Sequence, residues 1–493
     1  MFKKIWFGFA VMAFVVFISS FNIQKSEGPY MATGIKIGEV TSNSAIIWMR
    51  LTKNQERINN GPSPIITYKN DNTGKWSEIK GEGRPDREPK VEFPIGNSIE
   101  NIDGAVPGAS GEVRLLYKKK RSSDWIITKW DVVKSESDYA CQIKISDLKP
   151  AEHYEIEVQG RPLKGQESSC SIKGSFRTAP IPEVINPVSF TVVTGTAYPD
   201  RDSSNFGFKI YPQMLKLNPD FFVHTGDIIY YDQKAKTPAL ARWHWDQMYS
   251  LPSNIEFHRQ VASYFIKDDH DTWMNDAYPT MKTRFMGEFT FKQGQEIFLQ
   301  EAPMGEKTYR TIRWGKDLQI WLPEGRDFRS DNDAPDGPQK TIWGKEQMEW
   351  FKKTVEASDA TFKVLVSPTP IIGPDRSQKN DNHANAGFRY ESKVIKDFIT
   401  AQKNMYIVCG DRHWQYVSKD PASGILEFSC GPASNEHAGG WPQNERRPEH
   451  LYLNVTGGFL QIKIDRTAGK PEIAFTHYGV NGNVLFEYKQ QTK

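Results

Sequence analysis

The stretch Phe221-Phe222-Val223-His224-Thr225-Gly226-Asp227-Ile228-Ile229-Tyr230-Tyr231-Asp232 decides how this chain folds. Its first three residues are an apolar run, which predicts a buried strand. Gly226 permits a sharp turn, so Asp227 follows at the carboxyl end of that strand. Open α/β sheets bind their ligands at this end, and Asp227 is therefore the first candidate site residue.

Two later stretches repeat this design of an apolar run followed by carboxylate and imidazole side chains. Residues 262–266 are followed by Lys267-Asp268-Asp269-His270-Asp271, and residues 405–409 by Gly410-Asp411-Arg412-His413. A single Gly-Asp could be an ordinary turn, since both residues dominate turns. Three such motifs, two of them with histidine, indicate one site that supplies the several oxygen and nitrogen ligands two neighbouring cations need.

Length and charge limit the classes to which the protein can belong. A chain of 493 residues is expected to form two or three domains, and 38% hydrophobic residues are enough for sizeable cores. Lys plus Arg total 63 and Asp plus Glu total 60, a net charge of +3. This balance argues against a general nucleic-acid or membrane-surface binder. We expect a monomer without sequence-specific nucleic-acid binding.

The N-terminus has the pattern of an export signal. Lys3-Lys4 precedes an apolar run over residues 5–18, and Ser19-Ser20 offers small residues for cleavage. The run is shorter than the about 20 residues that span a membrane, and an uncleaved anchor is the alternative. We expect residues 1–27 to be a signal peptide, and the protein to be periplasmic or extracellular without a stable membrane anchor.

Export permits disulfide bonds among the four cysteines. Cys141 and Cys170 form one group in the sequence, and Cys409 and Cys430 form another. A bond within each group is one alternative, although spacing alone does not set connectivity. For the second group, on neighbouring core strands, two buried free thiols are the other alternative.

Residues 28–180 have the pattern of an all-β sandwich domain. Alternation places Tyr154, Ile156 and Val158 on one face of a strand. Leu148 and Pro150, which precede that strand, and the tyrosine within it resemble the corner of a fibronectin type III-like sandwich. The segment is longer than the about 100 residues of such a sandwich, and we expect an insertion within residues 52–130.

A proline-containing linker at residues 181–187 leads to a second domain over residues 188–493. Strands alternate with helices there and antiparallel strands follow, which predicts a four-layer α/β/β/α domain of the α/β class. The predicted strands include residues 190–193, 318–322, 362–366, 425–428, 459–464, 472–475 and 484–488. The predicted helices are residues 208–217, 238–249, 345–357 and 391–400.

Individual roles follow from the side-chain chemistry. A carboxylate can place one oxygen on each of two ions, so Asp227 is the best bridging ligand. Tyr230 could bind as a phenolate or be a packed aromatic residue. Asp269 is a ligand candidate, and His270 could contact a substrate oxygen or protonate a leaving group. Asp271 is expected to orient that imidazole. Asp411 and His413 are favoured as a ligand pair.

These three motifs resemble the PhoD-type alkaline phosphatases, which belong to the calcineurin-like metallophosphatases and also carry a β-sandwich before the catalytic domain. The resemblance implies that Asp227 bridges two ions. Tyr230 and His413 would join one of them, while Asp269 and Asp411 would join the other. His270 would take the place of the histidine that contacts substrate.

Further candidates come from Glu324-Gly325-Arg326-Asp327-Phe328-Arg329, which resembles a motif of the same family. Arg326 is expected to clamp a phosphate with its planar fork, and Arg329 to clamp a phosphate or brace a carboxylate, with structural ion pairs as the alternative. Asp381 and His383 stand where the family often has an Asp-rich turn, and are candidate ligands. For His437 an ordinary loop histidine is favoured over a residue lining the mouth of the site.

One position departs from the family pattern. The family commonly places a cysteine ligand after the first strand of the catalytic domain, whereas this chain has Gly195 near that point. We therefore expect a weaker first metal site, filled by another ion or completed by Thr196 or water. Replacing Gly195 by cysteine should restore a donor, provided that the backbone there does not need a positive φ.

The function predicted from these observations is hydrolysis of phosphoric esters, as an alkaline phosphatase, a phosphodiesterase or both. Two or more divalent or trivalent ions (Ca, Fe, Zn or Mn) would activate water for attack on phosphorus. One rival is a surface protein whose sandwich binds carbohydrate or another polymer and whose catalytic domain is inert. Another rival is hydrolysis of a different ester, such as a sulfate, but the cysteine or serine nucleophile of a sulfatase-like site is missing.

Overall fold

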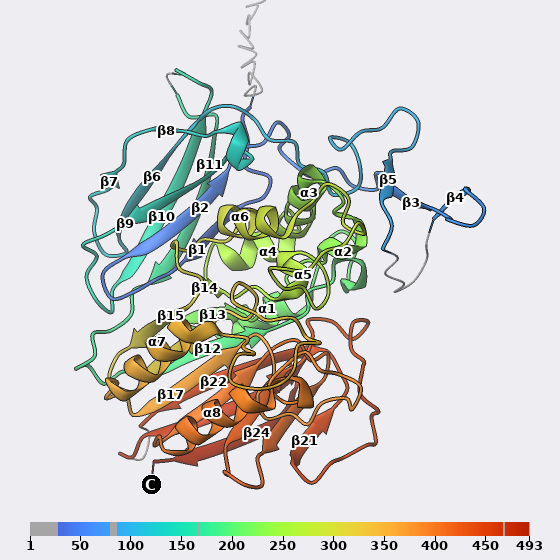
Figure 1. Ribbon diagram of the computed structural model, residues 1–493. Coiled ribbons are helices and arrows are strands. Elements are labelled where there is room, and N and C mark those ends of the chain that lie inside the picture. The colour runs from blue at the N-terminus through green and yellow to red at the C-terminus, as the bar shows by residue number, and fades with distance from the viewer. Residues whose placement is uncertain (1–27, 79–85, 166, 467–468, 493) are drawn as a thin grey trace, which may run out of the picture.

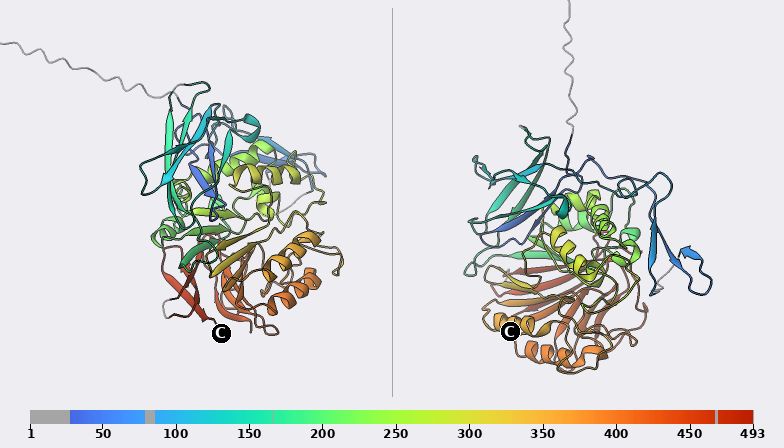
Figure 2. Two further views of the ribbon diagram at one scale, coloured as in Figure 1. Left: turned by 90° about the vertical axis from the view of Figure 1, so that its left-hand side faces the viewer. Right: turned by 45° about the horizontal axis from the view of Figure 1, so that its top comes forward.

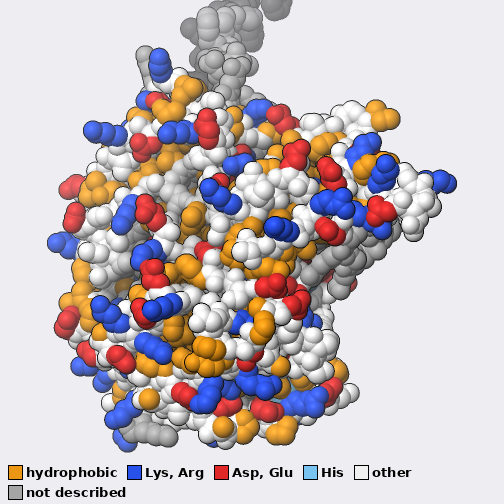
Figure 3. Space-filling view, viewed as in Figure 1, with side chains coloured by type: hydrophobic (Ala, Val, Ile, Leu, Met, Phe, Trp, Pro, Cys, Tyr) orange, Lys and Arg blue, Asp and Glu red, His pale blue; other side chains and the backbone are white. Residues whose placement is uncertain are grey.

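The computed structural model describes residues 28–78, 86–165, 167–466 and 469–492. The predicted signal peptide at residues 1–27 lies outside the described residues. Among the residues that are described, no helix combines the length and the apolarity needed to cross a lipid bilayer. Lysine and arginine side chains are interspersed with aspartate and glutamate over the face in Figure 3, as the balanced composition leads one to expect.

The strand that begins at Phe221 lies in the middle of a nine-stranded sheet. The strand order is β24 (Val484–Gln491), β23 (Glu472–Gly479), β22 (Gly458–Asp465), β12 (Val188–Val193), β13 (Phe221–His224), β14 (Ala262–Phe265), β1 (Ile35–Gly38), β2 (Ala45–Arg50) and β9 (Ala140–Ile145). Strands β12, β13 and β14 are parallel. All four residues of β13 are buried, which confirms the prediction of a buried strand.

A seven-stranded sheet packs against this one. Its order is β15 (Arg310–Trp314), β16 (Leu318–Leu322), β17 (Phe362–Ser367), β18 (Met405–Cys409), β20 (Leu426–Cys430), β19 (Gln415–Lys419) and β21 (His450–Asn454). Side chains of both sheets form one apolar core. The ring of Phe221 stacks on that of Trp314 with centroids 4.9 Å apart, so the two sheets are in direct contact.

Helices cover the outer faces of both sheets (Figures 1 and 2). On the nine-stranded sheet lie α1 (Ile210–Lys216), α2 (Tyr231–Lys234), α3 (Pro238–Tyr249), α4 (Pro252–His258), α5 (Asp269–Thr272) and α6 (Phe291–Glu301). On the seven-stranded sheet lie α7 (Gly344–Glu356) and α8 (Arg389–Thr400). The described residues also contain the 3-10 helices η1 (Ser135–Ser137), η2 (Tyr198–Asp200) and η3 (Ala386–Phe388). The predicted four-layer α/β/β/α architecture is confirmed.

The N-terminal region is the predicted all-β sandwich. Its second sheet contains β6 (Glu112–Lys119), β7 (Ile126–Ile127), β8 (Asp131–Val132), β10 (His153–Arg161) and β11 (Cys170–Arg177). Tyr154, Ile156 and Val158 are all buried, and the Tyr154 hydroxyl accepts a hydrogen bond from the backbone N–H of Lys149 at 2.8 Å. The alternation therefore identified the core face of this strand correctly.

The sandwich is joined to the rest of the molecule by its own strands. Strand β1 pairs in parallel with β14 through Gly38 and Ser263, so one sheet runs through both regions. The expected insertion forms a small sheet of β3 (Ile65–Lys69), β4 (Trp76–Glu78) and β5 (Pro89–Glu92), which projects to one side in Figure 1. Tyr68 of β3 stacks on Phe285 at 5.7 Å, which anchors the insertion to the catalytic region.

The cysteines do not form the disulfide bonds that were one alternative. All four are free thiols. Cys409 and Cys430 are fully buried, and burial raises the pKa of the Cys430 thiol to about 12. This pair therefore matches the alternative of two buried thiols, which are unreactive because they stay protonated.

Candidate metal centre

Two of the three motifs place an aspartate in a left-handed backbone conformation just beyond a strand. Asp227 follows β13 with φ +55°, and Asp411 follows β18 with φ +62°. Aspartate tolerates this region better than most residues, and such positions concentrate at functional sites. Gly226 has φ +104°, and a Cβ there would lie 2.6 Å from Cβ of Asp268. Only glycine fits this turn.

The first group contains two candidate ligands, Asp227 and Asp269, together with His270. One ligand atom from each lies within 4.8 Å of the others. Asp227 is 1% exposed, and its Oδ1 has no hydrogen-bond partner among the described residues. Burial, followed by the repulsion of Asp269 and neighbouring carboxylates, raises the pKa of Asp227 well above its ordinary value. A buried carboxylate oxygen of this kind fits a cation.

A second group gathers around the Tyr230 hydroxyl. This oxygen lies 3.4 Å from Asp227 Oδ2, 3.4 Å from His413 Nε2 and 2.6 Å from His437 Nε2. His413 Nε2 is 3.6 Å from Asp227 Oδ2. The structure thus brings Tyr230 and His413 together with Asp227, as the sequence predicted. His437, for which an ordinary loop histidine was favoured, lies in the same group.

Asp411 lines the same pocket from the end of β18. It forms an ion pair with Arg412 at 3.0 Å. Burial raises the pKa of Asp411 to about 6, with the attraction of Arg412 opposing and the repulsion of Asp381 and Asp269 adding to the shift. Like Asp227, it is a carboxylate whose charge is incompletely balanced by the protein.

The partner of His270 differs from the prediction. Its Nδ1 lies 3.1 Å from Oδ1 of Asp232, whereas Asp271 turns away. Asp271 accepts hydrogen bonds from the backbone N–H groups of Ile228 at 2.5 Å and Ile229 at 3.0 Å. The prediction that Asp271 orients the imidazole is therefore wrong, because its carboxylate is used to fix the loop that carries Asp227.

The two arginines predicted to bind phosphate are buried among protein groups. Arg326 is 1% exposed, and its Nε donates to Asp268 Oδ1 at 2.6 Å. Arg329 is 4% exposed and donates to Asn332 and to the backbone carbonyl of Asp381. Neither lines the pocket. Arg326 corresponds to the alternative of a structural ion pair, whereas the partners of Arg329 are an amide and a carbonyl, and its Nη1 has no hydrogen-bond partner among the described residues.

Asp381 and His383 are also held by other protein groups. Asp381 lies 3.1 Å from Lys379 and 3.6 Å from Arg412, and although burial opposes ionisation, these cations hold the pKa of its carboxyl below the usual range. His383 Nε2 lies 2.9 Å from Glu391 Oε2 at the start of α8. Neither residue lines the pocket, so the structure does not bring them to the ligand groups.

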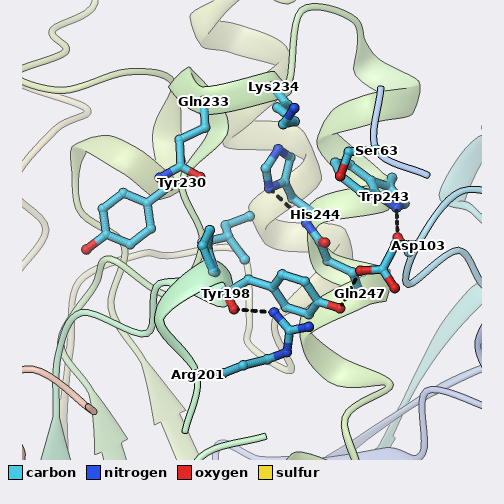
Figure 4. Close-up of a pocket in the computed structure, with 12 residues that line it drawn as sticks. Ser63, Asp103, Tyr198, Arg201, Tyr230, Gln233, Lys234, Trp243, His244 and Gln247 are labelled. Atoms are coloured by element: carbon cyan, nitrogen blue, oxygen red, sulfur yellow. Dashed lines mark hydrogen bonds between the residues drawn. The ribbon is translucent and has the colours of Figure 1, made fainter. Parts of the chain in front are cut away.

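The pocket in front of the ligand groups has a volume of about 960 Å³. Its cationic side chains are not the two predicted arginines but Lys234, Arg376 and Lys379. A smaller side pocket of about 190 Å³ includes Tyr198 and Trp243 in its lining. Tyr230 lines both cavities, and its hydroxyl points away from the side-pocket residues (Figure 4). The site can therefore hold a group on either side of this tyrosine.

The residues present fit metal ions. Asp227, Asp269, Asp411, Tyr230 and His413 supply oxygen and nitrogen donors from loops that follow strands of both sheets, and Oδ1 of Asp227 is buried without a hydrogen-bond partner in the described part of the chain. Sequence reasoning missed Asp232, Arg376 and the contacts of His437. Asp232 ends the stretch that decides the fold, but nothing in its spacing connects it to His270.

Fold and site together define a metallophosphatase preceded by a β-sandwich. A model of the PhoD-like phosphatase family matches residues 190–456, more than half of the chain. The chain belongs to the PhoD-like phosphatase family, whose members are phosphoric ester hydrolases.

Solved structures agree on the fold. A structure of PhoD aligns with TM-score 0.71 at 15% identity, covering 95% of this chain and 91% of that one. Purple acid phosphatase PPD1 from yellow lupin (Lupinus luteus) seeds aligns with TM-score 0.58 at 12% identity, covering 91% of this chain and 79% of that one. No curated protein sequence matches the chain. At these identities the structures support the fold alone.

Proposed function

We propose that this protein is an exported hydrolase of phosphoric monoesters, diesters or both, which uses at least two metal ions. The observation that carries the proposal is the convergence of Asp227, Asp269, His270, Asp411 and His413 on one pocket. Family membership supports the ester class, and Lys3-Lys4 with its apolar run supports export. Bound cations would supply Lewis acidity and generate the nucleophile from water near neutral pH.

The protein's own residues position the substrate and move the proton. Arg376 and Lys379 line the pocket and offer N–H donors to phosphate oxygens. With Nδ1 of His270 held by Asp232, its Nε2 is the nitrogen left to donate a proton to the leaving oxygen. Burial disfavours the imidazolium, but the carboxylates of Asp232, Asp269 and Asp227 outweigh it and raise the pKa of His270 well above its ordinary value.

Diester hydrolysis is the second activity that an observation favours. A diester carries a substituent on each side of the phosphorus, and the site has a large pocket and a side pocket on the two sides of Tyr230. A monoester needs only one of these spaces. The ratio of the diester rate to the monoester rate therefore reports whether the side pocket holds the second substituent of a diester.

The test compares p-nitrophenyl phosphate with bis(p-nitrophenyl) phosphate, using protein loaded separately with Ca²⁺, Fe³⁺, Zn²⁺ or Mn²⁺. We expect turnover of at least one substrate, lost in Asp411→Asn together with bound metal. Failure on both substrates at full metal occupancy would support the rival of an inert, polymer-binding protein. Intact-mass analysis of exported material tests the signal peptide, and a retained N-terminal segment would contradict it.

The remaining parts of the proposal concern organisation. We place a fibronectin type III-like domain at residues 28–180, a linker at 181–187 and the catalytic domain at 188–493, acting as a monomer. The alternating strand at Tyr154 and the turn that its hydroxyl caps support the first assignment. Expression of residues 188–493 alone tests the boundary. Because β1 pairs with β14, we expect that fragment to be less stable than the whole chain.

A further inference from the structure

We propose that His437, held by Asp200, is a ligand of the cation bound by Asp227, Tyr230 and His413, and that Gly195 leaves the space for its ring. The inference rests on the proposed metal centre and deepens it. It assigns a donor at the point where the sequence shows none, and it predicts which ion the site prefers.

The distances around Tyr230 have the size of a coordination sphere. Ligand bonds of about 2.1 Å place neighbouring donors of a tetrahedral site about 3.4 Å apart. Three separations come close to this value: Tyr230 Oη to Asp227 Oδ2 at 3.4 Å, Tyr230 Oη to His413 Nε2 at 3.4 Å, and His413 Nε2 to Asp227 Oδ2 at 3.6 Å. Three donors thus already surround one point.

His437 presents its Nε2 to this group. The atom lies 2.6 Å from Tyr230 Oη, and the His437 ring lies 4.1 Å from the His413 ring between centroids. Because Asp200 holds the proton-bearing Nδ1 of His437, the contact to Tyr230 is a hydrogen bond that Nε2 accepts from the phenol. If Tyr230 bound a cation as phenolate and released its proton to solvent, the Nε2 lone pair would be available to the same ion.

Asp200 gives His437 the environment of a metal ligand. Its Oδ2 lies 2.8 Å from Nδ1 of His437, and the side chain of Asp200 comes from η2, far from the loop of His437 in sequence. A carboxylate that accepts from one ring nitrogen fixes the tautomer and leaves the other nitrogen as a lone-pair donor. This is the arrangement commonly found behind metal-bound histidines.

Gly195 lies against the same two imidazole rings. Its φ is +56°, and a Cβ there would come within 3.2 Å of Cδ2 of His437 and 3.4 Å of Cδ2 of His413. A side chain at this position would compete with His437 for space. In this chain an imidazole from a distant loop thus occupies the region that a longer residue at 195 would fill.

The exchange of donors has a consequence for metal choice. The resembling family places a cysteine thiolate, an anionic and soft donor, near position 195. With the neutral imidazole of His437 in its place, the site in this chain carries one negative charge less. Imidazole, carboxylate and phenolate suit a borderline divalent ion such as Zn²⁺. We expect the first site to bind Zn²⁺ tightly and to discriminate less in favour of trivalent ions.

The experiment measures Zn²⁺ binding by competition with a chromogenic chelator, on the full chain without its signal segment. Four proteins are compared: wild type, His437→Ala, Asp200→Asn and the control Glu436→Gln, which removes the exposed carboxylate beside His437 at the pocket and leaves the imidazole in place. We expect Asp200→Asn to weaken one of the sites by about 10- to 100-fold, the usual effect of losing the carboxylate behind a ligand. His437→Ala should weaken it at least as much, and Glu436→Gln should not change it.

Pulsed electron paramagnetic resonance of the Cu²⁺-substituted protein counts the coordinating imidazole nitrogens. His437→Ala should show one fewer than wild type. Equal Zn²⁺ affinity and an equal nitrogen count in the two proteins would show that His437 only hydrogen-bonds Tyr230, and would overturn the proposal. Far-UV circular dichroism of the variants checks folding. If His437→Ala does not fold, the Zn²⁺ affinity of Asp200→Asn tests the proposal in its place.

Activity separates this proposal from the proposed function. If wild type hydrolyses neither ester yet loses Zn²⁺ affinity on His437→Ala, the ligand assignment stands and the function fails. If wild type hydrolyses esters and His437→Ala binds Zn²⁺ unchanged, the ligand assignment fails alone. The two readouts are therefore independent.

Discussion

At the scale of single residues, Gly195 shows how a missing side chain can shape a metal site. We expected cysteine at this position to restore a donor only if the backbone there does not need a positive φ. The observed φ of +56° means that this condition is not met. An L-residue in the left-handed region costs about 1–2 kcal/mol. Any side chain at 195 would also press on the rings of His413 and His437.

We therefore predict that Gly195→Ala lowers the free energy of unfolding by about 1–2 kcal/mol and also weakens metal binding. The matched control is Gly96→Ala, because Gly96 has φ +80° but a Cβ added there would meet nothing within 4 Å. Gly96→Ala should lower the free energy of unfolding through backbone strain and should leave metal affinity unchanged. Urea unfolding and chelator competition measure the two effects. Equal metal affinity in both variants would show that the space at Gly195 is not used.

Asp232 is the residue on which the acid role of His270 depends. We predict that Asp232→Asn keeps its metal but lowers turnover by up to about 100-fold, the lower end of what a general acid contributes. The loss should be larger for phenyl phosphate than for p-nitrophenyl phosphate, because the better leaving group needs less protonation. Steady-state rates on both esters measure this, and equal losses on the two would assign Asp232 a structural role.

At the scale of elements, a buried ion network connects the loops after β14 and β16. Arg326 pairs with Asp268, while Lys267 pairs with Glu324 at 2.5 Å and Asp327 at 2.6 Å. Removing one partner of a buried pair leaves an uncompensated charge, which costs about 3–5 kcal/mol. We predict that Arg326→Leu lowers the free energy of unfolding by that amount, as measured by urea denaturation. A loss below about 1 kcal/mol would show that the pair with Asp268 does not stabilise the fold.

The insertion sheet brings a carboxylate to the pocket. Glu78 of β4 lines it and is exposed, so it repels an anionic ester. We predict that Glu78→Gln lowers KM for phosphate monoesters by about two- to fivefold at low salt, less than about 1 kcal/mol, with the gain fading as salt is added. Glu92→Gln on β5 of the same sheet lies outside the pocket lining and should leave KM unchanged. Equal effects of the two changes would point to net charge alone.

Sequence patterns predicted those features that depend on neighbours in the chain. The helix at 238–249 and the strands at 318–322 and 405–409 have the predicted bounds, because periodicity and flanking Pro or Gly residues are local signals. Asp227, Asp269 and Asp411 were found because each follows an apolar strand with parallel neighbours. Asp227 and Asp269 lie at one edge of the nine-stranded sheet, as parallel strands require, whereas Asp411 reaches the same pocket from the seven-stranded sheet packed against it.

The features that were missed depend on contacts between distant segments. Tyr230 and His437 are 207 positions apart, and His270 of α5 finds its partner Asp232 in a different helix, α2. The pairing of β1 with β14 rests on Gly38 and Ser263. No periodicity records such contacts, because only the folded chain decides which side chain faces which. The buried arginines were misassigned for the same reason.

At the scale of the whole molecule, the core contains several histidines that burial keeps neutral. Burial lowers the pKa of four of them: His224, His244, His258 and His477. His477 on β23 is fully buried and its Nε2 lies 2.9 Å from the carbonyl oxygen of Ser429, to which it donates. The pKa of His477 in the folded protein is about 4, against 6.5 when unperturbed. It lies outside the ligand groups and can be tested without disturbing them.

The unfolded chain therefore binds a proton at His477 between pH 6.5 and about 4 that the folded protein does not. Stability from this residue is fully present above pH 6.5 and is lost as the pH falls toward 4, to a total of about 3 kcal/mol. We predict that the urea midpoint of the metal-free protein falls over this range, and falls less in His477→Gln. His153→Gln, on the exposed side of β10, is the comparison: partial burial and Arg177 also lower the pKa of His153, so this change should reduce the fall less than His477→Gln does. If the urea midpoints of His477→Gln and wild type fall equally between pH 6.5 and about 4, the acid sensitivity of the fold comes from other groups.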